Sequence, residues 1–277
     1  MVLFNFEIAE FTRSLQSSNG LRHGDYHRYR RFCARKIHRI RSDLKLLNGR
    51  NRFKKAVLPE RINSSRYIEL LVVYVERAWA HGLTLKSEHS VCERGGKSRL
   101  RHAFIKKFRR SAHWVDQLVE VSKLHCDERT QKEAEAYQAW IHGLSLTESG
   151  FYEKALQTLT IAETKYTDLI KTSLDSVFPN ASRGYKHRIA DLEPIQRVCK
   201  YKLRLGAISA SAEGPKQEAK EEEYESANEG GVGEFSSDGE YVDSDVDMSP
   251  TYSKRMTNSE QSGGLLGKIG GWWNRSN

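Results

Sequence analysis

The sequence predicts an all-α fold, a tetratricopeptide-like helical bundle of antiparallel helix pairs followed by a disordered acidic tail. Three observations lead to this prediction: apolar residues recur at helical spacing in several long segments, one pair of segments matches a helical-repeat pattern, and the composition changes sharply after residue 205. We therefore divide the chain into a helical domain, 1–205, and a Gly/Ser-rich acidic tail, 206–277.

The first strong helical segment begins at Asp25, a residue suited to cap a helix, and is expected to stop at Asn48-Gly49. At about 100° per residue, its apolar positions fall within an arc of about 80°, the width expected of a core-facing stripe. Arg28, Arg31, Arg35 and Arg39 fall within a second arc that is centred nearly opposite. The apolar arc is made of Tyr29, Cys33, Ile37, Ile40, Leu44 and Leu47.

Two further segments are expected to complete this half of the bundle. The run Leu70–Val75 alone could be a strand, but the apolar pattern extends from Arg66 to Leu85, and this length favours a core helix. After the Gly95-Gly96 break, residues 98–124 place Phe104 and Phe108 on one side and a series of basic residues on the other. This segment repeats the design of the first helix.

Residues 128–170 predict two helices that are broken at Ser149-Gly150 and resemble one tetratricopeptide-type hairpin. Small residues at fixed positions let paired helices approach closely, and large residues fill the remaining space. A single repeat cannot bury its own face, so the flanking helices must act as its neighbours. A last helix, 184–205, is expected to kink or restart at Pro194. The matching positions are Trp140, Gly143, Leu144, Gly150, Tyr152, Ala155 and Ala162.

Charge is distributed very unevenly along the chain, although the net charge is only +9. Residues 1–125 hold 27 Lys and Arg against 11 Asp and Glu, and residues 126–205 hold 12 against 11. Residues 206–277 hold 6 against 14 and include the run Glu221-Glu222-Glu223. A basic block of this size is typical of a protein that binds a polyanion.

The candidate binding residues lie in the first helix and the loop that follows it. A solvated helix face normally interleaves Glu with Lys, whereas here a single acid, Asp25, faces the whole series between residues 22 and 41. The planar fork of arginine suits phosphate and guanine edges, and an exposed arginine-rich helix suits structured RNA whose major groove is opened by a bulge or junction. The candidates are Arg22, Arg28, Arg30, Arg31, Arg35, Lys36, Arg39, Arg41, Arg50, Arg52, Lys54 and Lys55.

Other classes of function have little support in the sequence. No apolar run approaches the roughly 18 to 20 residues that a membrane span needs, and the amino terminus does not have the pattern of a secretory signal. Gly95-Gly96-Lys97-Ser98 does not complete a Walker-A nucleotide-binding motif, because Val91 stands where that motif requires glycine, and we interpret it as a basic interhelical loop. The pair His23 and His27 has no third ligand nearby. We therefore expect no cofactor, no metal and no catalysis, and an intracellular protein.

The residues also resemble a known family, the amino-terminal RNA-binding domain of the signal recognition particle 68-kDa subunit. The resemblance covers about 1–205. It rests on Gly20-Leu21-Arg22-His23-Gly24-Asp25-Tyr26-x-Arg28-Tyr29-Arg30 with Cys33, Arg35, Arg39 and Arg41, and on Arg66-Tyr67, Glu76-Arg77-Ala78-Trp79, Ser98-Arg99-Leu100-Arg101, Glu135-Ala136-Tyr137 and Arg188-Ile189 to Tyr201.

The resemblance implies a subunit that binds and remodels the junction region of the particle's RNA for cotranslational targeting to the endoplasmic reticulum. It implies a cytoplasmic location with nucleolar assembly and endoplasmic reticulum association, and an indirect link to the ribosome. Other particle proteins are implied partners, including the 72-kDa subunit, although 206–277 does not look like the family region that binds it. The resemblance also implies further RNA contacts, at Lys97, Arg99, Arg101, Lys106, Lys107, Arg109 and Arg110.

One alternative from another class remains open at the level of sequence. The hairpin between Trp140 and Ala162 is also what a tetratricopeptide-type adaptor would use to bind peptide partners. Capture of peptide partners that is insensitive to ribonuclease would favour the adaptor over the RNA-binding subunit.

Overall fold

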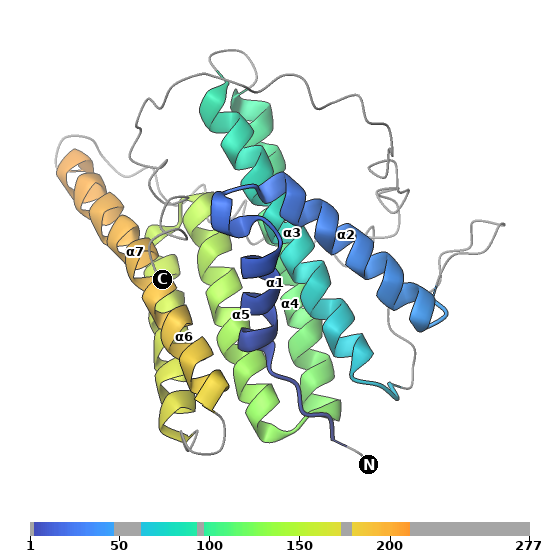
Figure 1. Ribbon diagram of the computed structural model, residues 1–277. Helices are drawn as coiled ribbons and strands as arrows, with labels where there is room; N and C mark the ends of the chain where they lie inside the picture. The colour runs from blue at the N-terminus through green and yellow to red at the C-terminus, as the bar shows by residue number, and fades with distance from the viewer. Residues whose placement is uncertain (1–2, 47–61, 93–96, 173–178, 211–277) are drawn as a thin grey trace, which may run out of the picture.

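The computed structural model describes residues 3–46, 62–92, 97–172 and 179–210 (Figure 1). Within these ranges the chain forms only helices, apart from one isolated bridge between Phe4 and Cys126. The elements are α1 (Ile8–Ser18), the short 3-10 helix η1 (Leu21–His23), α2 (Tyr26–Asp43), α3 (Arg66–Val91), α4 (Lys97–His125), α5 (Glu128–Ser149), α6 (Tyr152–Thr172) and α7 (Pro179–Ala210).

Each helix from α2 to α7 packs against the next one in the chain, so the six form an ordered array (Figure 1). This confirms the predicted all-α fold of stacked helix pairs. Helix α1 departs from the sequential order, because it packs against α3, α5 and α7. Figure 1 shows it in the middle of the view, with α7 on one side and α3 on the other. No helix of the described residues is long and apolar enough to cross a membrane.

The core is centred on α3, which explains the apolar density of its sequence. Residues 70–73 and Val75 have no exposed surface, because α2 and α4 both pack against this helix. The ring of Tyr74 stacks on that of Trp114 with centroids 4.5 Å apart. Gly82 allows the Phe108 ring to approach, since a Cβ atom there would lie 3.0 Å from the ring. The prediction of a helix rather than a strand is confirmed.

The α5–α6 hairpin confirms the tetratricopeptide-type pattern in detail. The side chain of Asp127 caps α5 by accepting a hydrogen bond from the Thr130 backbone N–H, and Gly150 turns the chain with φ of 96°. A Cβ atom on Gly143 would lie 2.5 Å from Leu159 Cδ2, so a larger residue there would require the Leu159 side chain to move. The small residues of the pattern are therefore the points of helix contact.

Several elements differ from the sequence prediction, including α3, which ends at Val91 rather than near Leu85. Helix α2 ends at Asp43 rather than near Asn48, because Lys45 turns left-handed with φ of 56° and the Leu46 N–H donates to the Arg41 carbonyl. Helix α7 continues through Pro194 without restarting and extends past residue 205. Helix α1 was not predicted at all.

Helix α1 escaped prediction because its buried face is partly polar. The buried positions are Ile8, Ala9, Thr12, Leu15 and Gln16, which share one side of a helix. The segment is amphipathic, but it has only 11 residues, and with Thr and Gln among the buried positions only Ile8, Ala9 and Leu15 mark the buried side as apolar. These polar residues have a specific role, which is described below.

Candidate nucleic-acid interface

Helix α2 is fixed to the bundle by its apolar side, as its periodicity predicts. Its amino terminus is capped by Asp25, whose carboxylate accepts a hydrogen bond from the Arg28 N–H at 2.8 Å. Tyr29, Cys33 and Ile37 are almost completely buried where α2 packs against α3. The opposite side of the helix therefore faces solvent.

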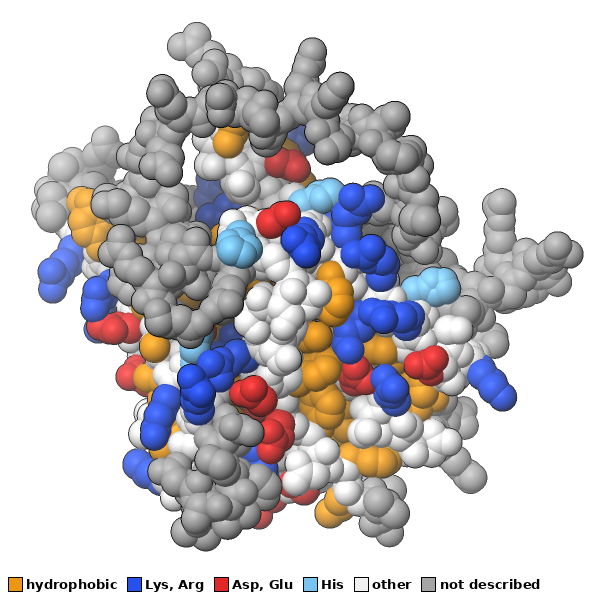
Figure 2. Space-filling model, in the orientation of Figure 1, with side chains coloured by type: hydrophobic (Ala, Val, Ile, Leu, Met, Phe, Trp, Pro, Cys, Tyr) orange, Lys and Arg blue, Asp and Glu red, His pale blue; other side chains and the backbone are white. Residues whose placement is uncertain are grey.

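Four arginines occupy this solvent side, and we call Arg28, Arg31, Arg35 and Arg39 the arginine face. All four are exposed, and none has an ion-pair partner among the described residues. Figure 2 shows basic side chains following α2 along the right of the view. The stem of Arg28 also packs over Gly20, where a Cβ atom would lie 3.0 Å from Arg28 Cδ. The result is a row of unpaired guanidinium groups on a rigid support.

Two other candidates on α2 have structural partners instead. The ammonium group of Lys36 forms an ion pair with Glu69 of α3 at 2.8 Å and lies 5.2 Å from the centre of the Phe11 ring. Arg41 is only 2% exposed, and its guanidinium donates to the Tyr74 hydroxyl and the Leu46 carbonyl. The position of Arg41 gives no support to its prediction as an RNA contact, because this side chain caps the carboxyl end of α2 from inside the bundle.

The helical periodicity explains both departures. At about 100° per residue, Lys36 and Arg41 each lie within about 40° of the edge of the apolar arc. Their long stems therefore pack against apolar neighbours while the charged ends reach polar partners. Arg30 lies at the same boundary and is half-buried.

The second basic stretch lies on α4, which packs against α3 and α5. Arg99, Arg101 and Lys106 are exposed, whereas Lys107, Arg109 and Arg110 are half-buried. Helices α2 and α4 share α3 as a neighbour, so the two basic stretches lie on the helices that flank α3. The remaining candidates Arg50, Arg52, Lys54 and Lys55, and the side chains of Arg22 and Lys97, lie outside the described residues.

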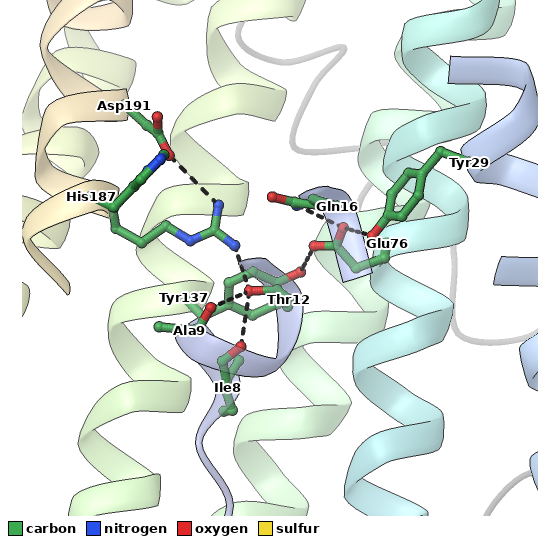
Figure 3. Close-up of polar contacts among 10 residues, drawn as sticks. Ile8, Ala9, Thr12, Gln16, Tyr29, Glu76, Tyr137, His187 and Asp191 are labelled. Carbon is green, nitrogen blue, oxygen red and sulfur yellow. Dashed lines mark hydrogen bonds and ion pairs between the residues drawn. The ribbon is translucent and has the colours of Figure 1, made fainter. Parts of the chain in front are cut away.

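A buried polar cluster lies beneath α2 and was missed in the sequence. Glu76 of α3 has no exposed surface and accepts three hydrogen bonds (Figure 3). The donors are the hydroxyls of Tyr29 at 2.6 Å and Tyr137 at 2.7 Å and the side-chain amide of Gln16 at 2.8 Å. These donors come from α2, α5 and α1, so one carboxylate joins four helices.

The cluster has the electrostatic character of a structural site. Burial and then the Glu76 charge raise the pKa of Tyr29 and of Tyr137 well above the usual range, which keeps both hydroxyls protonated as donors. Burial is also the main cause of the raised pKa of Cys33. A signal was present in the sequence, since Glu76 stands inside the most apolar helix.

The described residues contain no group of three His, Cys, Asp or Glu side chains that could hold a metal ion. His23 and His27 are both exposed. The Gly95-Gly96 break lies outside the described residues.

The fold and the arginine face together define a class of protein, a helical-repeat protein of the tetratricopeptide-like type with an arginine-rich helix at one end of its array. Comparison with known proteins identifies the family. Residues 21–232 match the family model described as RNA-binding signal recognition particle 68, and this match includes α2 to α7. The chain belongs to this family.

Curated relatives agree with this assignment. The signal recognition particle subunit SRP68 of Dictyostelium discoideum is 34% identical over 208 residues, which cover 73% of this chain and 33% of the relative. The protein of the same name from Drosophila melanogaster is 32% identical over 212 residues, covering 74% and 34%. The chain thus spans about a third of the length of these relatives.

A solved structure shows the same fold. The SRP68-RBD from Chaetomium thermophilum aligns with a TM-score of 0.57 and 22% sequence identity, covering 72% of this chain and all of that one. The family match extends past residue 205, where the sequence analysis placed the start of the tail. That domain boundary remains a prediction.

Proposed function

We propose that this protein is a non-catalytic RNA-binding scaffold subunit of the signal recognition particle and that the arginine face is its main contact with the particle's RNA. Membership of a family described as RNA-binding supports RNA as the ligand. The single observation that carries the proposal is the row of four exposed arginines without an ion-pair partner among the described residues. Uncompensated charge of this kind is stabilised when phosphates replace solvent.

The geometry of α2 supports a way of contacting and remodelling RNA. Guanidinium groups at positions i, i+3, i+7 and i+11 point to one side of the helix and can each bind phosphate or a guanine edge through two hydrogen bonds. The helix cannot tilt freely, because the Tyr29–Glu76 hydrogen bond and the Lys36–Glu69 ion pair fix it to α3. A rigid helix in an A-form major groove requires that groove to widen, which favours a bulge or junction.

The same proposal includes the context of the particle. The implied partners are the particle RNA, other particle proteins and, indirectly, the ribosome, in a cytoplasmic particle with nucleolar assembly and endoplasmic reticulum association. The basic stretch on α4 is proposed as a second contact. Association with the 72-kDa subunit is the least supported part of the proposal, because the chain spans only a third of its curated relatives.

The proposal is tested by measuring RNA affinity as a function of salt. We expect replacement of the four residues of the arginine face by Gln to weaken binding of the particle's RNA at physiological salt. Each lost phosphate contact reduces the salt slope by about 1, so the slope should fall by about 4. Gln is a good helix former, so α2 should persist, and circular dichroism checks this.

The matched control replaces four exposed basic residues of α7, which packs against α6 and α1 rather than α3. Arg183, Lys186, Lys200 and Lys202 replaced by Gln give the same change in net charge. We expect this variant to keep most of the affinity and slope. Equal losses in both variants, or binding no tighter than to an unrelated duplex, would contradict the proposal.

A further inference from the structure

The amino-terminal segment is placed like a ligand rather than like a member of the helix array. Helices α2 to α7 pack in sequential order, but α1 lies across every second helix, α3, α5 and α7. We call the surface formed by these three helices the α3–α5–α7 face. In stacked helical repeats, a face made of alternate helices is a surface on which extended ligands bind.

The start of the segment is bound through its main chain. The Phe4 N–H donates to the His125 carbonyl at 2.8 Å, and the Asp127 N–H donates to the Phe4 carbonyl at 3.1 Å. Two residues on, the Phe6 N–H donates to Thr130 Oγ1 at 3.0 Å, and this hydroxyl in turn donates to the Phe6 carbonyl at 3.2 Å. Paired main-chain contacts of this type give affinity in peptide recognition by strand addition.

The helical part is bound through buried charged groups of the three helices. Glu133 of α5 accepts a hydrogen bond from the Ala9 N–H at 2.6 Å, at the positive end of α1. Thr12 accepts a hydrogen bond from the Arg188 guanidinium of α7, and Gln16 donates to Glu76 of α3. Figure 3 shows Thr12 and Gln16 pointing from α1 toward these partners. Thr12 and Gln16, four residues apart on one side of α1, thus contact a cationic and an anionic side chain respectively.

Two of these charged groups, Glu76 and Arg188, also have partners that do not belong to α1. Glu76 also accepts hydrogen bonds from Tyr29 and Tyr137. The Arg188 guanidinium lies 4.4 Å from the centre of the Trp140 ring and 3.9 Å from the Asp191 carboxylate. Two of the three charged groups that contact α1 therefore keep a partner when α1 leaves, whereas Glu133 loses the hydrogen bond from the Ala9 N–H.

From these contacts we propose that residues 4–18 are an intramolecular peptide ligand and that the α3–α5–α7 face is a peptide-binding site. The site selects a segment that is extended at its start and then helical, with Thr and Gln four residues apart. Its own amino terminus is the occupant, so the face is closed to other peptides while α1 is docked. This inference does not depend on RNA binding and is tested without RNA.

The test separates α1 from the rest of the chain after folding. A specific protease site is inserted between His23 and Gly24, in the turn between α1 and α2, and the folded full-length protein is cleaved there. We expect the fragment to remain bound during gel filtration and to exchange with a labelled synthetic peptide of residues 1–20. An untagged peptide with Thr12→Val and Gln16→Leu should compete about tenfold less well or worse, because it loses the hydrogen bonds to Arg188 and Glu76 and covers these charged groups with apolar side chains.

The matched control peptide carries Ser14→Ala and Ser17→Ala, which change exposed positions of α1 and should compete as well as the natural sequence. Loss of the fragment from a chain that stays helical would overturn the proposal. Equal competition by both variant peptides would also overturn it, as would a fragment that exchanges only when the whole chain unfolds in urea.

Hydrogen exchange of the intact chain gives a second test that needs no insertion. A docked ligand can detach while the rest of the chain stays folded. The amides of α1 should therefore exchange through an opening reaction of lower free energy than the one that exposes the amides of α3. Equal protection of α1 and α3 would show that α1 is a permanent part of the core and would contradict the proposal.

Discussion

At the scale of single residues, Glu76 determines how α2 is held. Its carboxylate accepts hydrogen bonds from Tyr29, Tyr137 and Gln16, and it has no exposed surface. Replacing it by Leu leaves three buried donors without an acceptor, so we expect Glu76→Leu to lower the free energy of unfolding by about 3 kcal/mol or more. Urea denaturation measures this loss.

The control variant Glu88→Leu, at an exposed position of the same helix, should change stability by about 0.5 kcal/mol at most. Similar values for the two variants would show that the buried hydrogen bonds contribute little.

Glu133 makes a separate prediction about pH. Burial raises its pKa from 4.5 to about 7, against the opposing effects of the Ala9 N–H and Arg129. A carboxyl group whose pKa is raised on folding contributes stability below its unfolded pKa and loses it as pH rises through the folded value. We expect stability to fall by about 3 kcal/mol at this site between pH 4.5 and pH 8. Glu133→Gln should flatten this part of the profile. Glu153→Gln, an exposed substitution with the same charge change, should leave it unaltered. Parallel profiles for all three proteins would refute the assignment.

At the scale of elements, α2 separates residues that hold the fold from residues that contact a ligand. Arg41 and Arg39 lie two positions apart, yet Arg41 is buried with hydrogen bonds to Tyr74 and Leu46, and Arg39 is exposed. We expect Arg41→Gln to reduce stability by about 1.5–3 kcal/mol, the range for hydrogen bonds from a charged donor. Arg39→Gln should leave stability nearly unchanged and weaken RNA binding instead. Thermal unfolding and RNA titration of both variants separate the two roles. A stability loss confined to the Arg39 variant would contradict this division.

The α5–α6 hairpin tests the close approach of its helices. A Cβ atom on Gly143 would lie 2.5 Å from Leu159, whereas one on Gly206 of α7 would meet nothing within 4 Å. We expect Gly143→Ala to destabilise by about 1–3 kcal/mol through overpacking, despite the better helix propensity of Ala. Gly206→Ala should have no effect or stabilise slightly. Urea denaturation of both variants gives the comparison. A stabilised Gly143 variant would mean that α5 and α6 can move apart at little cost.

At the scale of the whole molecule, the sequence predicted the helix array because most helices have strong apolar periods and clear caps. Asp25, Asp127 and Gly150 act at the helix ends as their types predict. The arginine face followed from the same periodicity. The periodicity places Arg41 only at the edge of the apolar arc, and its hydrogen bond to the Leu46 carbonyl depends on a turn formed by Lys45, a residue that rarely adopts a positive φ.

The buried polar contacts of α1 could not be predicted from the local sequence pattern either, because they also depend on other parts of the fold. Thr12, Gln16 and Glu133 look like surface residues in the sequence, and their burial depends on partners that lie on distant helices. Long-range polar pairing has no period that a single sequence can display. The polar residues of α1 and their partners were thus missed because these contacts join segments that are far apart in the chain.

The charge asymmetry of the whole chain leads to the last prediction. Residues 1–125 carry a net +16, and residues 211–277 carry −8. An acidic segment tethered to a basic domain competes with RNA for the basic surface, and salt weakens this competition as the Debye length shrinks from about 30 Å at 0.01 M to about 10 Å at 0.1 M. We therefore expect deletion of 211–277 to raise affinity for an unrelated RNA several-fold at low salt and to have little effect at higher salt. Fluorescence titration across salt concentrations measures both.

A full-length variant with its tail Glu and Asp residues changed to Gln and Asn should match the deletion, because charge rather than length is responsible. Unchanged affinity in the deletion, or a gain that persists at high salt, would show that the tail does not act by electrostatic competition.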